Sequence, residues 1–225
     1  MPKNSRILCL FDVDGTLVDS QAHIMAAMTL AFTDLGLAVP AREEILGLVG
    51  LSLPIMMPKL APNAGVDVHE ALVEGYKSSF MRLRTETSSQ ATMPLFPGAK
   101  EAIAALNAEP ETLLGVATGK SRRGLDKVLE SHALTKTFVT EQVADHHPSK
   151  PHPSMLSSCS DDTGITSDRA AMIGDTSFDM EMAKAAGFFA VGVSWGYHDR
   201  ARLSAADVII DRFEDLQGVL RAHWG

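Results

Sequence analysis

The chain has 225 residues, a formal net charge of −8 and a hydrophobic fraction of 45%, an ordinary balance for a globular protein. At about 150 residues per domain, this length indicates one large domain or a core that carries a smaller insert. The two cysteines exclude a disulfide scaffold and are typical of a reducing compartment. The excess of acidic over basic side chains disfavours nucleic acid as a partner.

The hydropathy pattern also disfavours a membrane protein. No apolar run reaches the ~18 residues that suggest a membrane span. The apolar stretch before Asp12 covers only residues 7–11, which is too short for the core of a signal peptide. We therefore expect a cytoplasmic protein without a membrane partner.

Short apolar runs predict the strands of a parallel sheet. They cover residues 7–11, 113–117, 170–173, 190–193 and 208–210. These runs do not alternate apolar with polar residues, which is typical of strands covered on both faces. Helical stripes lie between them, at residues 99–106, at residues 125–132 after Ser121 as N-cap, and at residues 178–185 before Gly187 as stop signal. This alternation predicts an α/β fold with a doubly wound, Rossmann-like parallel sheet.

One long interval interrupts the alternation of strands and helices. Apolar stripes there predict one helix that ends near Gly36 and another that begins at Asp67, with Glu70 at the spacing of a capping box. Residues 85–97 are rich in Ser, Thr and Pro and predict a linker back to the core. We therefore expect an α/β core formed by residues 1–17 and 93–225, and an all-helical domain formed by residues 18–92.

Carboxylates follow two of the predicted strands. Asp12 and Asp14 come directly after the first strand, and Asp175 comes directly after the strand at residues 170–173. The carboxyl ends of parallel strands meet at one edge of a sheet, where such folds bind ligands. Each aspartate alone is an ordinary turn residue. Three together would repel one another without a cation, and Mg²⁺ with its preference for oxygen ligands is the natural partner.

The segment FDVDGTLVDS, residues 11–20, resembles the signature of the haloacid dehalogenase-like superfamily. Three further motifs follow in family order: Thr118 after an apolar strand, Lys150 within PSKPHP, and GDTSFD at residues 174–179. The resemblance spans nearly the whole chain and puts the helical insert in the place of a cap domain. The chain is most similar to the phosphoglycolate phosphatase-like members, through residues 17–20, the SKPHP run and WGYH at residues 195–198.

The resemblance implies a phosphatase that forms an aspartyl-phosphate. Asp12 is then the nucleophile, and Asp14 first protonates the leaving oxygen and later deprotonates water. Dehalogenase members attack carbon and lack the second aspartate, so the presence of Asp14 favours phosphate esters. The implied site comprises the catalytic residues Asp12, Asp14, Thr118 and Lys150, the phosphate-binding residues Gly15, Thr118, Gly119 and Lys150, the Mg²⁺ ligands Asp12, Asp14 (through its carbonyl) and Asp175, and the supporting Asp179.

The implied substrate is a small phosphate ester, with phosphoglycolate as the first candidate, and the implied assembly is a monomer or a homodimer. Two other functions stay open. One is a phosphosugar mutase of the β-phosphoglucomutase type, which has the same motifs. The other is a regulatory protein that binds a phosphometabolite without turning it over.

Several weaker signals receive an ordinary structural interpretation. Gly115 and Gly119 are separated by three residues, whereas a P-loop needs four, and Gly115 lies inside a predicted strand. The histidines at 146, 147 and 152 are expected to be solvated loop residues rather than zinc ligands. Residues 195–198 either line the entrance of the site or pack structurally. We expect residues 50–52 to face the substrate, and hinges at residues 18–20 and 85–94.

Overall fold

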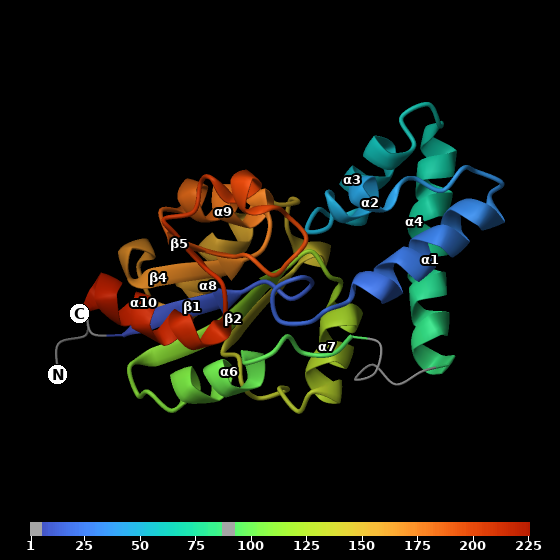
Figure 1. Cartoon of the computed structure of the whole chain (residues 1–225). Helices are drawn as coiled ribbons and strands as arrows, with labels where there is room; N and C mark the ends of the chain where they lie inside the picture. Colours follow the sequence, from blue (N-terminus) through green and yellow to red (C-terminus); the bar gives the residue numbers. More distant parts are fainter. Residues whose placement is uncertain (1–5, 87–92) are drawn as a thin grey trace.

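The computed structural model describes residues 6–86 and 93–225, and a parallel sheet of six strands lies at its centre (Figure 1). The strand order is β3-β2-β1-β4-β5-β6. The chain adds strands outward from β1 in one direction and then returns to add β4 on its other side. The strands are β1 (Ile7–Phe11), β2 (Thr112–Thr118), β3 (Thr140–Val143), β4 (Ala170–Gly174), β5 (Phe189–Val193) and β6 (Val208–Ile210). The predicted doubly wound α/β fold is confirmed.

Helices cover both faces of the sheet. Side chains alternate along a strand, so Cys9 and Phe11 of β1 pack on one face, and Leu8 and Leu10 pack on the other. The first face is covered by α6 (Ala99–Asn107), α7 (Arg122–Ser131) and α10 (Leu216–Trp224), and the second by α8 (Ser154–Thr163) and α9 (Ser177–Ala186).

The predicted helix signals in the core have the expected geometry. The hydroxyl of Ser121 accepts the N–H of Gly124 at 3.2 Å and caps α7, and Gly187 ends α9 with φ of 75°. Strand β3 has no counterpart among the predicted runs. It is an edge strand with the sequence TEQV, in which only Thr140 and Val143 are buried, so it has no continuous apolar stretch.

Four of the described helices between β1 and β2 form a hydrophobic cluster of their own: α1 (Gln21–Asp34), α2 (Arg42–Leu46), α3 (Leu53–Leu60) and α4 (Val66–Glu86). We call residues 21–86 the helical lobe. Its centre contains the buried side chains of Met28, Phe32 and Leu72. Helix α4 begins at Val66, so Asp67 lies in its first turn rather than at its cap. Helix α4 also extends to Glu86, and most of the predicted linker, residues 87–92, lies outside the described residues.

The lobe joins the core through two neighbouring segments. The N–H of Asp19 donates to the carbonyl of Pro94 at 2.8 Å, and the N–H of Phe96 donates to the carbonyl of Leu17 at 2.9 Å. Val18 and Leu95 form an antiparallel bridge between them. The outgoing and returning chains therefore form a short two-stranded ribbon.

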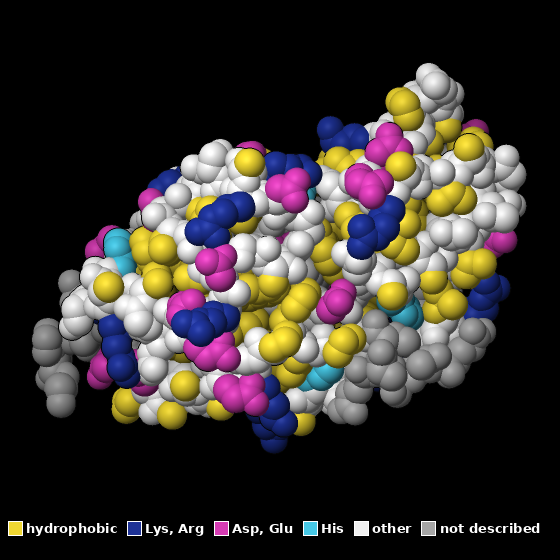
Figure 2. Space-filling model, in the orientation of Figure 1, with side chains coloured by type: hydrophobic (Ala, Val, Ile, Leu, Met, Phe, Trp, Pro, Cys, Tyr) yellow, Lys and Arg dark blue, Asp and Glu magenta, His cyan; other side chains and the backbone are white. Residues whose placement is uncertain are grey.

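The surface of the described residues shows no dominant charge of one sign on the face drawn in Figure 2, where basic and acidic side chains are interspersed over the core and the lobe. Among the helices that the structure describes, none combines the length and apolar composition that a membrane span requires.

The environment of Gly115 gives a prediction about packing. A methyl group at Gly115 would lie 2.6 Å from Leu10 Cδ2 and 2.7 Å from Thr140 Cγ2, both on neighbouring strands. We expect Gly115→Ala to lower the free energy of unfolding by about 1 to 3 kcal/mol through overpacking. The matched control is Gly218→Ala in α10, where nothing lies within 4 Å and alanine should stabilise the helix by about 0.5 to 1 kcal/mol. Urea unfolding of both variants tests this, and equal effects would contradict it.

Candidate functional site

The candidate site lies where β1, β2 and β4 end. Phe11, the last residue of β1, pairs with Val116 of β2 and with Ile173 of β4. The following residues therefore meet at the carboxyl edge beside the central strand, where the chain reverses the direction in which it adds strands. Crevices of this kind bind ligands in open α/β sheets.

Three buried carboxylates converge at this edge. Asp12, Asp175 and Asp179 are each 0 to 1% exposed, and they offer oxygens that all lie within 4.8 Å of one another. Among the side chains that the structure describes, it is the one cluster whose geometry fits a metal ion. The sequence analysis gave Asp179 a supporting role next to the Mg²⁺ ligands, whereas in the structure its carboxylate is one of the three that form the cluster.

Asp175 is enclosed by backbone that approaches closely. A side chain at Gly15 or at Gly196 would overlap the Asp175 carboxylate, and Gly15 has φ of 85°. Thr16 Oγ1 donates to Asp175 Oδ1 at 2.9 Å, and the N–H of Tyr197 donates to Oδ2 at 2.8 Å. Burial raises the pKa of Asp175 well above its ordinary value, and the charges of Asp179 and Asp12 raise it further, against these two donors.

Asp179 is oriented by the first turn of α9. The N–H and the hydroxyl of Thr176 donate to Asp179 Oδ2 at 3.0 and 2.6 Å. The N–H of Asp179 donates back to Thr176 Oγ1 at 3.3 Å, which completes a capping box. Because Oδ2 is used by the cap, Oδ1 is left facing the site. The spacing of Thr176 and Asp179 in the sequence was the signal that could have assigned this orientation.

Lys150 supplies the positive charge at the centre of the acidic cluster. Its Nζ lies 2.8 Å from Asp12 Oδ1 and 2.6 Å from Asp179 Oδ1, and its side chain is fully buried. Burial opposes the charge, but Asp12 and Asp179 outweigh that effect and raise the pKa of Lys150 above its ordinary value. Lys150 is therefore held protonated, with one unit of charge among three carboxylates.

The Asp12 carboxylate is incompletely satisfied. Both of its oxygens are buried, and neither forms a hydrogen bond of acceptable geometry, although Lys150 lies close to one of them. Burial raises the pKa of Asp12 to about 6, opposed by the charge of Lys150. Unpaired buried oxygens and an excess of carboxylates over cations are what a bound divalent ion would compensate. The residues present therefore fit Mg²⁺.

Asp14 lies outside the acidic cluster and has partners of its own. Its carboxylate is 2.8 Å from Lys120 Nζ and accepts a short hydrogen bond from Ser20 Oγ. The hydroxyl of Tyr197 is 2.9 Å from Ser20 Oγ and accepts the Ser20 N–H at 3.2 Å. Sequence reasoning gave no catalytic role to Ser20, the last residue of the first motif, or to Lys120, two residues after Thr118, and left the role of Tyr197 open.

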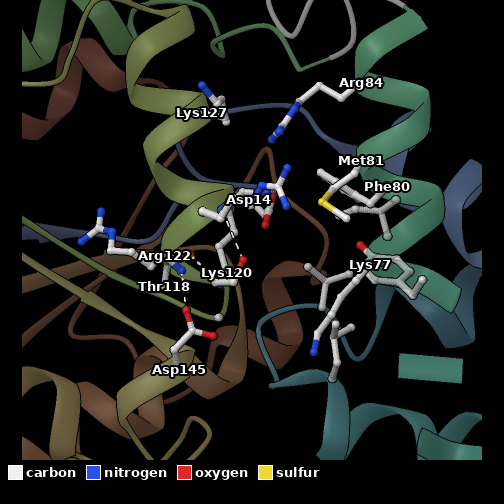
Figure 3. Close-up of a pocket in the computed structure, with 18 of the residues that line it drawn as sticks. Asp14, Lys77, Phe80, Met81, Arg84, Thr118, Lys120, Arg122, Lys127 and Asp145 are labelled. Atoms are coloured by element: carbon white, nitrogen blue, oxygen red, sulfur yellow. Dashed lines mark hydrogen bonds and ion pairs between the residues drawn. The ribbon is translucent and has the colours of Figure 1, made fainter. Parts of the chain in front are cut away.

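A cavity of about 790 Å³ separates the carboxyl edge of the sheet from the helical lobe (Figure 3). Asp12, Asp14, Thr118 and Gly119 line it from the core. The lobe contributes residues from α3 and α4, and Phe80 of α4 lies over the Lys120 ammonium, 5.2 Å from the ring centre. The carboxylates of Asp12 and Asp14 thus face a space that the lobe covers.

The turn at residues 50–52 meets the core at the edge of this cavity. Gly50 and Leu51 line the cavity, and a methyl group at Gly119 would lie 2.7 Å from the Gly50 carbonyl oxygen. The N–H of Ser52 donates to Ser149 Oγ at 2.9 Å, next to Lys150. This turn therefore lies against the predicted phosphate-binding loops.

The remaining predicted groups hold the loops of the site. Trp195 Nε1 donates to the carbonyl of Thr16 at 3.1 Å. His198 accepts the N–H of Ser177 at 2.9 Å on Nδ1, so its Nε2 donates to the carbonyl of Gly47 in the lobe at 3.1 Å. His147 uses both ring nitrogens for hydrogen bonds, to Gln142 and Ser154, which leaves none for zinc.

Comparison with known proteins assigns the family. The family model described as haloacid dehalogenase-like hydrolase matches residues 9–193. The chain belongs to this family, as its motifs indicated. It is 36% identical over 220 residues to a probable phosphatase IndB of Dickeya dadantii, covering 96% of this chain and 94% of that protein. It is 31% identical over 226 residues to a phosphoglycolate phosphatase of Salmonella paratyphi A, covering 92% and 89%.

Solved structures of the haloacid dehalogenase-like fold resemble the whole chain. A predicted phosphoglycolate phosphatase from Haemophilus somnus superposes with a TM-score of 0.84 at 21% identity, covering 96% of this chain and 99% of that one. A β-phosphoglucomutase from Clostridium difficile gives 0.80 at 19% identity, covering 97% and 98%. At these identities the likeness concerns the fold.

The raised pKa of Asp12 predicts a pH dependence of stability in the absence of divalent ions. The folded pKa of about 6 exceeds the ordinary value of about 3.9, so the folded state binds more protons between them, and stability falls as the pH rises through that window. Asp12→Asn removes this titration and should be more stable than the wild type above about pH 6. Thermal unfolding in EDTA across this range tests it, and an unchanged slope in Asp12→Asn would contradict it.

Proposed function

We propose that this protein is an Mg²⁺-dependent phosphomonoester hydrolase that acts on small phosphometabolites through an aspartyl-phosphate on Asp12. Phosphoglycolate is the first candidate substrate. The phosphatase and phosphoglycolate phosphatase names of the relatives support the reaction class and this first choice.

One observation carries the proposal. The Asp12 carboxylate is buried, accepts no hydrogen bond of acceptable geometry from the described residues beside its ion pair with Lys150, and faces a covered cavity next to two further carboxylates. The lone pairs of an oxygen that accepts no hydrogen bond are available for nucleophilic attack. Thr118 and Gly119 line the same cavity, which is where the phosphoryl oxygens would bind.

In the first half-reaction, an Asp12 oxygen attacks phosphorus and the bond from phosphorus to the ester oxygen breaks. Asp14 transfers a proton to that leaving oxygen. Lys150, the hydroxyl of Thr118 and the backbone at Gly119 would stabilise the charge on the phosphoryl group, which is the main requirement of phosphoryl transfer. The product alcohol then leaves the cavity.

In the second half-reaction, Asp14 takes a proton from water, and the water oxygen attacks phosphorus. The bond from phosphorus to Asp12 breaks, which releases phosphate, restores the Asp12 carboxylate and leaves Asp14 protonated for the next cycle. Lys120 forms an ion pair with Asp14 and Ser20 donates a hydrogen bond to it, so both residues fix the position of the Asp14 carboxyl group.

Asp12, Asp175 and the carbonyl of Asp14 would hold Mg²⁺, with Asp179 as a further oxygen donor. When bound, the ion neutralises part of the carboxylate charge and polarises the phosphoryl group. We also propose that residues 18–92 act as the cap domain of a core formed by residues 1–17 and 93–225. The cap would exclude water from the cavity and contact the leaving group.

Phosphate release from a panel of esters tests the proposed function. The panel contains phosphoglycolate, sugar phosphates, nucleoside monophosphates and pyrophosphate, each assayed with Mg²⁺ and with EDTA. We expect release to depend on Mg²⁺ and to fall by several orders of magnitude in Asp12→Asn, since no nucleophile remains. The proposal would be rejected if the folded wild type released no phosphate from any compound of the panel, or if Asp12→Asn kept full activity.

Ser20 offers a test of how Asp14 is positioned. Its hydroxyl touches Asp14 and lies outside the described cavity lining, so Ser20→Ala should lower kcat about tenfold and leave KM nearly unchanged. The matched control is Ser194→Ala, which removes an exposed serine–aspartate hydrogen bond to Asp211. Steady-state kinetics of both variants measure the difference, and a change confined to KM would contradict the positioning role.

A further inference from the structure

The cavity contains more ionic side chains than the reaction at Asp12 requires. Apart from Asp12 and Asp14, each acidic side chain of its lining already has a partner. These pairs are Glu74 with Lys77 at 2.7 Å, Asp126 with Arg122 at 2.9 Å, Glu130 with Lys127 at 2.5 Å, and Asp145 with the N–H of Arg122 at 2.6 Å.

Of the lining side chains that the structure describes, two arginines have no such partner. Arg84 extends from α4 of the lobe, and Arg123 lies in the first turn of α7 of the core. Within the described part of the chain, no carboxylate forms an ion pair with either guanidinium. Partial burial lowers the pKa of Arg84, and the charge of Arg123 lowers it further, while Glu130 raises it. The core and the lobe therefore present like charges to each other across the cavity.

Arg84 lies beyond the reactive end of the cavity. Phe80 and Arg84 are four residues apart on α4, so they share a face, and Arg84 lies about 6 Å farther along the helix axis. Phe80 covers Lys120, which pairs with Asp14. Arg84 and Lys127 lie at the same end of the cavity on facing helices, and Arg84 points into the space between them (Figure 3). The order from the reactive carboxylates outward is thus Asp14, Lys120, Phe80 and Arg84.

The lobe contributes mainly apolar side chains to the cavity lining. They are those of Leu53, Met56, Tyr76, Phe80 and Met81. A leaving group in this cavity would therefore contact apolar side chains of the lobe, and a negative charge on it would be favoured where the arginines are.

We propose that Arg84 and Arg123 form an anion subsite that selects phosphomonoesters whose leaving group ends in a second anionic group, a carboxylate or a phosphate. This inference rests on the proposed function for its phosphoryl end. An anion between the two guanidiniums removes their repulsion and links the lobe to the core. Binding of such an ester therefore holds the lobe over the site, whereas an ester with a neutral end leaves the repulsion in place.

Matched esters test the selection. The set comprises alkyl phosphates of several chain lengths whose far end is a methyl group, a carboxylate or a second phosphate. For the wild type we expect kcat/KM to be about tenfold or more higher for the anionic ends. Arg84→Gln and Arg123→Gln should each abolish that preference, with kcat/KM for the methyl-ended esters unchanged or raised, because each substitution also removes the repulsion between the guanidiniums. Arg84→Lys should restore part of it, and added salt should weaken it.

The matched control is Arg82→Gln, an exposed arginine of α4 outside the described cavity lining. It should keep the full preference. Equal kcat/KM values for anionic and methyl-ended esters in the wild type would overturn the subsite, and so would equal losses for both ester types in Arg84→Gln. A preference for only one of the two anions would assign the subsite to carboxylate or to phosphate.

A binding measurement separates this inference from the reaction itself. Alkylphosphonates cannot be hydrolysed, so calorimetric titration with a carboxylate-ended and a methyl-ended alkylphosphonate, in the presence of Mg²⁺, reports the subsite without turnover. We expect the carboxylate-ended probe to bind about tenfold tighter, and Arg84→Gln to remove the difference. If this difference appears while no ester is hydrolysed, the proposed reaction fails and the subsite stands. Equal affinities of the two probes would overturn the subsite.

Discussion

Three carboxylates that repel one another are buried at one point of the fold, and the residues around them must offset this repulsion. Asp12, Asp175 and Asp179 come from the ends of two strands and from the first turn of a helix, and Lys150 balances only part of their charge. Isolated buried charges are costly, so the surrounding residues are arranged to support them. Glycine backbone encloses Asp175 and a capping box orients Asp179, whereas the Asp12 oxygens accept no hydrogen bond of acceptable geometry from the described residues and have the ion pair with Lys150.

Some features of this arrangement depend on neighbouring residues in the sequence, and these could be predicted. Short apolar runs predicted the sheet, and the aspartates that follow two of them predicted the edge where the acidic groups meet, because both features are encoded within a few residues. Strand β3 was missed because an edge strand with two buried positions needs no apolar run. Helix α8 gave no clear stripe since its sequence is rich in Ser and Asp, although Met155, Leu156 and Cys159 form its buried face.

The partners of Asp14 could not be predicted for a different reason. Tyr197, which contacts Ser20, is 177 positions away from it in the sequence. Lys120 lies just after β2, in a segment whose sequence is also typical of an ordinary turn. Contacts across such separations depend on how the lobe and the loops pack, and one sequence carries no signal for them. The contacts of His198 with Gly47 and of Ser149 with Ser52 have the same origin. They join the loops of the site to the lobe from two sides.

The ribbon that joins lobe and core restricts how the two can move. Leu17 and Asp19 on the outgoing chain are hydrogen-bonded to Phe96 and Pro94 on the returning chain. Rotation about a single linker would break these bonds, whereas bending both strands together keeps them. The lobe therefore has few independent degrees of freedom, and little conformational entropy is lost when it is fixed in one orientation. An ester that bridges the cavity would keep most of its interaction energy as affinity.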